Sequence, residues 1–124
     1  FSVKTLMRSS VDTAKDALAQ KFEAIFSLAG IETSFAGGYS GWAPNPDSAI
    51  LATMKKVYND LYGKEPAVMA IHAGLECGII SEKLPGLDII SCGPVVLDLH
   101  SPDEALNVAS FERFFTVVKD VIGK

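Results

Sequence analysis

Hydrophobic and polar residues change pattern twice over the first forty positions, and the changes predict a strand, a helix and a second strand. Residues 1–9 alternate in character, as a strand with one covered face does. After a cap at Ser10 or Asp12, apolar residues recur at helical spacing until Gly30, which is expected to end the helix. Residues 31–36 predict the second strand. The apolar helix positions are Leu18, Phe22, Ile25, Phe26 and Ala29. This order is a β-α-β unit.

Residues 41–46 break the pattern with two prolines and a glycine, in the sequence Gly41-Trp42-Ala43-Pro44-Asn45-Pro46. Such a cluster is the best linker signal in the chain. Two interpretations remain open: a boundary between domains, or a simple loop in which Trp42 packs on a neighbour.

The second half predicts helices that alternate with continuously apolar strands. A helix capped by Asp47 or Ser48 should run to Gly63, with a short helix around 75–83 and a final helix near the C-terminus. The apolar runs 67–71 and 87–91 predict strands. The final helix places Phe111, Phe114, Phe115, Val118, Val121 and Ile122 on one face. Continuous apolar strands between helices indicate an α/β fold with a parallel sheet.

Composition narrows the class of protein. The 124 residues are 48% hydrophobic, enough for one globular core, and the net charge is −4 with no basic run, so a nucleic-acid surface is not expected. No apolar stretch approaches the ~18 residues of a membrane span, and no signal peptide is visible. The chain starts at Phe1, within a predicted strand, and therefore reads as part of a longer protein. Cys77 and Cys92 fit buried free thiols in a reducing compartment.

One segment combines a turn, a histidine and a helix-start signal. It begins with the apolar run 87–91, turns at Gly93-Pro94 and leads to His100. The sequence Ser101-Pro102-Asp103-Glu104 predicts a capping box with proline at the first helical position. A histidine at such a junction is held on a rigid scaffold and faces outward, as a ligand or catalytic group would. An ordinary surface histidine is the alternative.

This segment, together with others, resembles aminoacyl-histidine dipeptidases, which are cytosolic di-zinc metallopeptidases of the carnosinase-like kind. The resemblance rests on four motifs that occur together. They are Met7-Arg8-Ser9-Ser10-Val11-Asp12, Gly41-Trp42-Ala43-Pro44-Asn45-Pro46-Asp47-Ser48, Ile71-His72-Ala73-Gly74-Leu75-Glu76-Cys77-Gly78, and Gly93-Pro94 with His100-Ser101-Pro102-Asp103-Glu104.

The resemblance implies a C-terminal fragment made of two parts. Residues 1–46 would be the second half of an α+β lid, or dimerisation, domain, and residues 47–124 the last segment of a zinc-exopeptidase-type catalytic α/β domain. The parent would hydrolyse Xaa-His and related dipeptides in the cytoplasm, with two zinc ions activating water. The general base and the other metal ligands would lie upstream, so the fragment alone is expected to be inactive and not to bind zinc tightly.

Four residues carry roles implied by the resemblance. His100 would be a zinc ligand, and Arg8 would bind the substrate carboxylate or the transition-state oxyanion with its guanidinium group. Gly74 would shape the substrate pocket, and Glu76 would assist there. From sequence alone, Arg8 also fits a solvent-facing strand residue, and Glu76 fits a carboxylate that favours a helix N-terminus.

Other polar residues have structural explanations. His72 and Glu76 are four apart, but Gly74 disfavours the helix that would make them a metal site, so His72 is expected to be structural. The capping box accounts for Asp103 and Glu104. Asp12, Asp47 and Asp98 fit caps or solvated acids, and neither a nucleophile elbow nor a phosphate-binding loop is present.

A non-catalytic interaction module is the alternative function. A half lid with unpaired strand edges would pair with another chain, so self-association through residues 1–40 is expected under this hypothesis. The expected partners are thus a dipeptide substrate and a second copy of the chain, with neither nucleic acid nor membrane involved.

Overall fold

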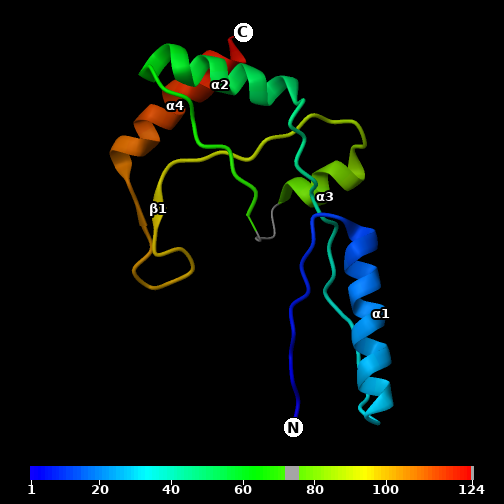
Figure 1. The fold of residues 1–124 in the computed structure, drawn as a ribbon. Helices are drawn as coiled ribbons and strands as arrows, with labels where there is room; N and C mark the ends of the chain where they lie inside the picture. The colour runs from blue at the N-terminus through cyan, green and yellow to red at the C-terminus, as the bar shows by residue number, and fades with distance from the viewer. Residues whose placement is uncertain (72–75, 124) are drawn as a thin grey trace. The chain divides into compact units, whose positions relative to one another are not determined.

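The computed structural model of the chain describes residues 1–71 and 76–123. In this part, helix α1 (Asp12–Leu28), helix α2 (Ala49–Tyr62) and helix α3 (Glu76–Lys83) are followed by strands β1 (Val96–Leu97) and β2 (Ala105–Leu106) and helix α4 (Val108–Ile122), as Figure 1 shows. The chain forms two units. The first joins Phe1–Asn45 with Ala70–Leu87, and the second joins Pro46–Met69 with Asp88–Lys124.

Helix α1 lies where periodicity placed it, but its N-terminal cap differs from the prediction. The N-cap residue is Val11, which makes no side-chain cap bond, and the Ser9 hydroxyl accepts the Val11 amide at 3.1 Å. The C-terminus follows the prediction. Gly30 has a φ of 69°, its amide donates to Ser27 O, and the Ile31 amide donates to Phe26 O. These two bonds form a Schellman motif, which needs a left-handed residue and so favours glycine.

Helix α2 is capped by two side chains, only one of which was predicted. The Ser48 hydroxyl accepts the Leu51 amide at 3.0 Å, and Ser48 is buried. The Asp88 carboxylate, far along the sequence, accepts the Ile50 amide at 3.0 Å. Hydrogen bonds from the Ser48 side chain and then from the Ile50 amide hold the pKa of Asp88 below its ordinary value of 3.8. Asp88 therefore ties the segment before β1 to the start of α2.

The stability contributed by Asp88 should depend on pH. Because its folded-state pKa is lowered, the contribution is fully present above the unfolded value of 3.8 and is lost as the pH falls through the folded value. We expect Asp88→Asn to remove this part of the loss of unfolding free energy at low pH. Urea unfolding followed by circular dichroism between about pH 2 and 7 measures it. Asp103→Asn, an exposed acid that caps no helix, is the control, and an unchanged pH profile in Asp88→Asn would contradict the assignment.

Helices α2 and α4 pack against each other and form the small core of the second unit. Val57 of α2 and Val117 of α4 are the buried apolar residues of the described chain, at 3% and 4% exposure. Tyr62 adds a polar link, because its hydroxyl donates to Arg113 O of α4 at 3.1 Å. Val57 and Val117 are therefore the positions in this packing at which a lost methyl group would leave a cavity shielded from water.

Val117→Ala is expected to lower the free energy of unfolding by about 2 kcal/mol. The change removes two buried methyl groups, each worth roughly 0.8 kcal/mol, and leaves a cavity. Urea denaturation gives the value. Val108→Ala, made on the same helix at a position 67% exposed, should change it by less than about 0.5 kcal/mol. Equal losses in the two variants would show that α4 does not pack as described.

The strand predictions for 1–9, 31–36, 67–71 and 87–91 are wrong for this structure. No strand is present at these positions among the described residues, and 1–9 runs as an irregular, drawn-out trace in Figure 1. The β1–β2 sheet is antiparallel, with Val96 opposite Leu106 and Leu97 opposite Ala105, and the described residues contain no parallel pair of strands such as the sequence predicted. A strand exists only through hydrogen bonds to a neighbour. An apolar pattern indicates that a segment is buried, but it does not indicate whether a neighbouring strand or another part of the protein buries it.

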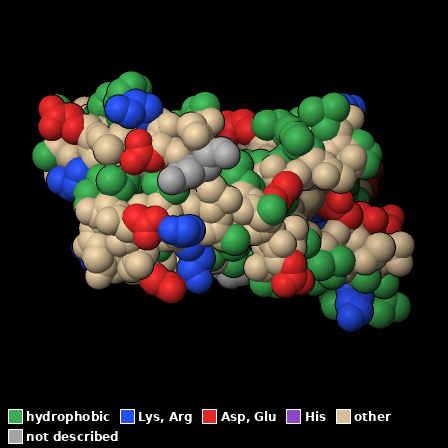
Figure 2. Space-filling view, turned by 90° about the horizontal axis from the view of Figure 1, so that it is seen from above, with side chains coloured by type: hydrophobic (Ala, Val, Ile, Leu, Met, Phe, Trp, Pro, Cys, Tyr) green, Lys and Arg blue, Asp and Glu red, His purple; other side chains and the backbone are tan. Residues whose placement is uncertain are grey.

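Many apolar side chains remain exposed in both units. Helix α1 has no buried residue, and its Ile25 and Leu28 are 64% and 91% exposed. On α4, Phe115 and Ile122 are 61% and 81% exposed. Figure 2 shows such hydrophobic side chains at the surface between charged ones. None of the helices in the described residues is long and apolar enough to cross a membrane.

Candidate functional site in the β1–β2 loop

The seven residues 98–104 connect β1 to β2 and carry His100. Two consecutive turns build the loop. The Ser101 amide donates to Asp98 O at 3.1 Å, and the Glu104 amide donates to Ser101 O at 3.2 Å. The Ser101 hydroxyl also accepts the Asp103 amide at 3.1 Å. Pro102 occupies the second position of the second turn, where its fixed φ is favourable. The loop is therefore ordered by its own hydrogen bonds, and His100 is exposed on it.

The backbone of this loop is strained at the histidine. His100 has a φ of 65° and Asp98 a φ of 50°, and these are the positive-φ residues other than glycine in the described chain. His100 is the third residue of the turn 98–101, where turns of this kind usually carry glycine or asparagine. A left-handed conformation costs an ordinary side chain about 1 to 2 kcal/mol. Such strain is concentrated at functional sites, where neighbouring contacts hold it in place.

The predicted capping box at 101–104 is wrong. No helix begins at Pro102. Instead β2 follows at Ala105, and α4 starts at Val108 with Asn107 as its cap, whose side chain accepts the Ser110 amide at 2.9 Å. A serine followed three residues later by glutamate suits a turn as well as a helix start, since both satisfy free amide groups locally. The Glu104 carboxylate accepts the amide of His100 at 2.9 Å, where a capping box would use that of Ser101.

The other predicted site residues lie in the first unit or outside the described residues. Arg8 is exposed on the segment before α1. Glu76 is exposed in the first turn of α3, the position in which a carboxylate favours the helix dipole. Gly74 and His72 fall outside the described residues. His100 belongs to the second unit, so the structure does not bring the predicted residues together within one unit.

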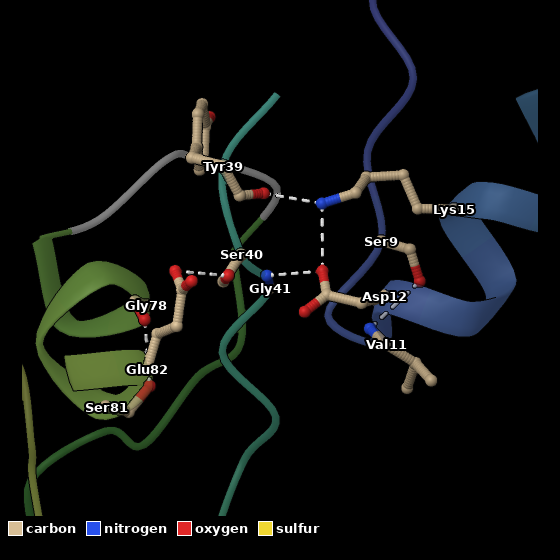
Figure 3. Close-up of polar contacts among 10 residues, drawn as sticks. All are labelled: Ser9, Val11, Asp12, Lys15, Tyr39, Ser40, Gly41, Gly78, Ser81 and Glu82. Atoms are coloured by element: carbon tan, nitrogen blue, oxygen red, sulfur yellow. Dashed lines mark hydrogen bonds and ion pairs between the residues drawn. The ribbon is translucent and has the colours of Figure 1, made fainter. Parts of the chain in front are cut away.

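A polar network in the first unit fixes residues 39–41 (Figure 3). The Lys15 ammonium donates to the Asp12 carboxylate at 2.8 Å and to Tyr39 O, and Asp12 accepts the Gly41 amide at 2.8 Å. The hydrogen bond from Lys15, and then that from Gly41, hold the pKa of Asp12 below its ordinary value. On the other side, the Ser40 hydroxyl donates to Glu82 of α3 at 2.7 Å. Asp12 is therefore a cross-link and not the predicted cap.

Two glycines allow segments of the backbone to lie very close together in this network: Gly41 beside Ser10, and Gly78 beside Ser40. A Cβ on Gly41 would lie 2.7 Å from the backbone C and O of Ser10, and one on Gly78 would lie 2.5 Å from Ser40 O. Both distances are shorter than real Cβ contacts. Each position therefore requires glycine because of the space available, although neither has a positive φ.

Zinc is the metal that the resemblance implies, with His100 as the expected ligand. The imidazole of His100 is exposed, and imidazole nitrogen is a standard zinc ligand. Within residues 1–71 and 76–123, no three His, Cys, Asp or Glu side chains converge where they could hold a metal ion. Cys77 and Cys92 form no disulfide with each other in the described residues; Cys77 is half-buried and Cys92 is exposed, so the expectation of two buried thiols is wrong for Cys92. The chemistry of the His100 side chain therefore suits a metal ligand, but the described residues do not form a complete metal site around it.

Two hydrogen bonds that order the second unit were not predicted from the sequence. The bond from Asp88 to the start of α2 spans 38 residues, so no local signal marks it. The bond from Glu104 to His100 spans four residues and was hidden by the capping-box pattern. The sequence Ser101-Pro102-Asp103 is typical of a turn and is the signal that could have indicated one.

Comparison with known proteins agrees with the motifs. No family model matches the chain. The chain is 33% identical over 120 residues to the cytosol non-specific dipeptidase of Escherichia coli strain K12, a match that covers 97% of this chain and 25% of that protein. The crystal structure of an aminoacylhistidine dipeptidase from Vibrio alginolyticus matches with a TM-score of 0.76 and 36% identity, over 89% of this chain and 22% of that one. The chain thus spans about a quarter of the length of these relatives, and the predicted resemblance is confirmed.

Proposed function

We propose that this chain, a homologue of part of the aminoacyl-histidine dipeptidases, contributes a metal ligand and substrate contacts to a metallo-dipeptidase. His100 in its strained, self-ordered loop is the observation that carries the proposal. The similarity to two dipeptidases over most of the chain supports it. The substrate would be a dipeptide, including those with C-terminal histidine, as the name of the Vibrio relative suggests.

The roles proposed for the residues are those that the resemblance implies, and the chemistry of each side chain suits its role. His100 would hold one zinc ion through a ring nitrogen, and zinc when bound lowers the pKa of water so that it can attack a peptide carbonyl. Arg8 would pair its guanidinium fork with the carboxylate of the dipeptide or the developing oxyanion. Gly74 would leave room for the substrate, and Glu76 would contribute a carboxylate beside it.

The parental organisation is part of the same proposal. Residues 1–46 would form half of the lid and 47–124 the end of the catalytic domain, in a cytoplasmic enzyme. The name of the Escherichia coli relative, a cytosol dipeptidase, supports this location. Since no three metal-binding side chains converge within residues 1–71 and 76–123, where a zinc site needs three or more ligands, we propose that the chain is inactive by itself.

A graft tests the proposed function. This chain replaces the matching 120 residues of the Escherichia coli dipeptidase, and the product is assayed for zinc content and dipeptide hydrolysis. We expect bound zinc and hydrolysis in the graft, and neither in the chain alone. A folded graft that retains neither would contradict the proposal.

An interaction module is the second candidate, favoured by the exposed apolar residues of α1, among them Ile25 and Leu28. Exposed apolar surface of this kind is often covered by a partner. We propose that the chain forms a homodimer through residues 1–40. Light scattering on the full chain measures its mass, and a monomer at all concentrations tested would count against the dimer.

A further inference from the structure

The side chain of Glu104 is hydrogen-bonded to the backbone of His100, in addition to the two turns that form the loop. Its carboxylate Oε2 accepts the backbone amide of His100 at 2.9 Å, so the side chain reaches back across the second turn to the first. The two turns alone bond the amides of Ser101 and Glu104 to preceding carbonyls. Neither of these bonds engages the His100 amide, which sits at the strained position.

The orientation of that amide and the direction of the imidazole are linked. Rotation about φ at His100 moves the peptide amide relative to the Cα–Cβ bond, from which the ring projects. A charge-assisted bond from the amide to a carboxylate is stronger than a neutral one and fixes the rotation. Holding φ at 65° therefore also fixes where the ring leaves the loop.

We propose that Glu104 is a positioning residue that holds His100 in its left-handed conformation and so fixes the direction in which the imidazole leaves the loop. The proposal rests on the function proposed above, in which His100 is a metal ligand. Glu104 does not itself touch the metal. It acts through the backbone of His100, as groups that orient metal ligands commonly act from behind them.

The conformation can be tested on the full chain by NMR. A positive φ brings the amide proton and Hα of the same residue close, so His100 should give a strong NOE between them. We expect Glu104→Ala to weaken this NOE and to speed exchange of the His100 amide. Glu104→Gln, which keeps an acceptor oxygen, should largely preserve both. Asp103→Ala removes the neighbouring carboxylate and should leave both unchanged. An undiminished NOE in a folded Glu104→Ala chain would overturn the proposal.

Metal affinity in the grafted dipeptidase provides the functional measurement. We expect Glu104→Ala to weaken zinc binding about tenfold or more, as loss of orienting groups does, and Glu104→Gln to recover most of it. The probe is zinc alone, titrated against a competing chelator. If His100→Ala leaves zinc affinity unchanged, the proposed function fails. If His100→Ala abolishes binding while Glu104→Ala does not weaken it, only the positioning role fails.

Discussion

Replacing His100 with alanine in the grafted dipeptidase is expected to lower kcat/KM for a dipeptide by at least about 100-fold, with loss of bound zinc. Orienting groups behind metal ligands are commonly worth 10- to 100-fold, and a ligand itself should be worth more. Activity and zinc content are measured on the same preparations. Leu99→Ala, which truncates the exposed neighbour in the loop, is the matched control and should retain both.

Three substitutions at His100 separate the ring from the backbone. Asparagine and glycine adopt a positive φ more readily than alanine does. If the imidazole binds metal, all three variants lose zinc. Their stabilities should differ. We expect His100→Gly and His100→Asn to be at least as stable as the parent chain, and His100→Ala to be no more stable than the parent chain. Zinc retention in His100→Asn would show that the position matters for its backbone alone, and the ligand assignment would be wrong.

Helices were predictable because their signal is local. The spacing of Leu18, Phe22 and Ile25 predicts α1, and Gly30 marks its end through a left-handed conformation that glycine adopts readily. Ser48 likewise caps α2 from one residue away. Each of these features depends on side chains and backbone within a few residues of each other.

Features that depend on distant partners were not predictable. The run 87–91 is apolar enough for a strand, but it pairs with no strand among the described residues, and its Asp88 instead caps a helix from far along the chain. Local signals also fail where two structures satisfy the same pattern. Ser101 and Glu104 fit a capping box and a pair of turns equally, and the choice is decided by the hairpin that β1 and β2 form around them.

The candidate site was found through the resemblance and only partly through the residues themselves. His100 stood out in the sequence as a histidine beside a turn, but its positive φ and its bond to Glu104 could not be read there. Turn geometry is set by where the two strands end, and two-residue strands leave no clear pattern. The strain at His100 is therefore information that only the structure supplies.

The close crossing at Gly41 gives the second large expected effect. Gly41→Ala should destabilise the first unit by about 3 kcal/mol, the upper part of the range for overpacking. The new Cβ would meet the backbone of Ser10 at 2.7 Å and Ser9 O at 2.8 Å. Backbone atoms cannot turn away as a flexible side chain can. The Gly41 amide is also bonded to Asp12, so moving this residue would break a further contact.

The close approach of residues 40–41 to α3 can also be tested at Gly78, where two effects of an alanine substitution oppose each other. Gly78 lies inside α3, so alanine would favour the helix by about 1 kcal/mol. Its Cβ would lie 2.5 Å from Ser40 O, and the steric cost of about 1 to 3 kcal/mol should exceed that gain. Urea unfolding of both variants is compared with Gly38→Ala, whose Cβ would meet nothing within 4 Å. If Gly41→Ala is no less stable than Gly38→Ala and Gly78→Ala gains stability, residues 40–41 do not cross the first unit between Ser10 and Gly78.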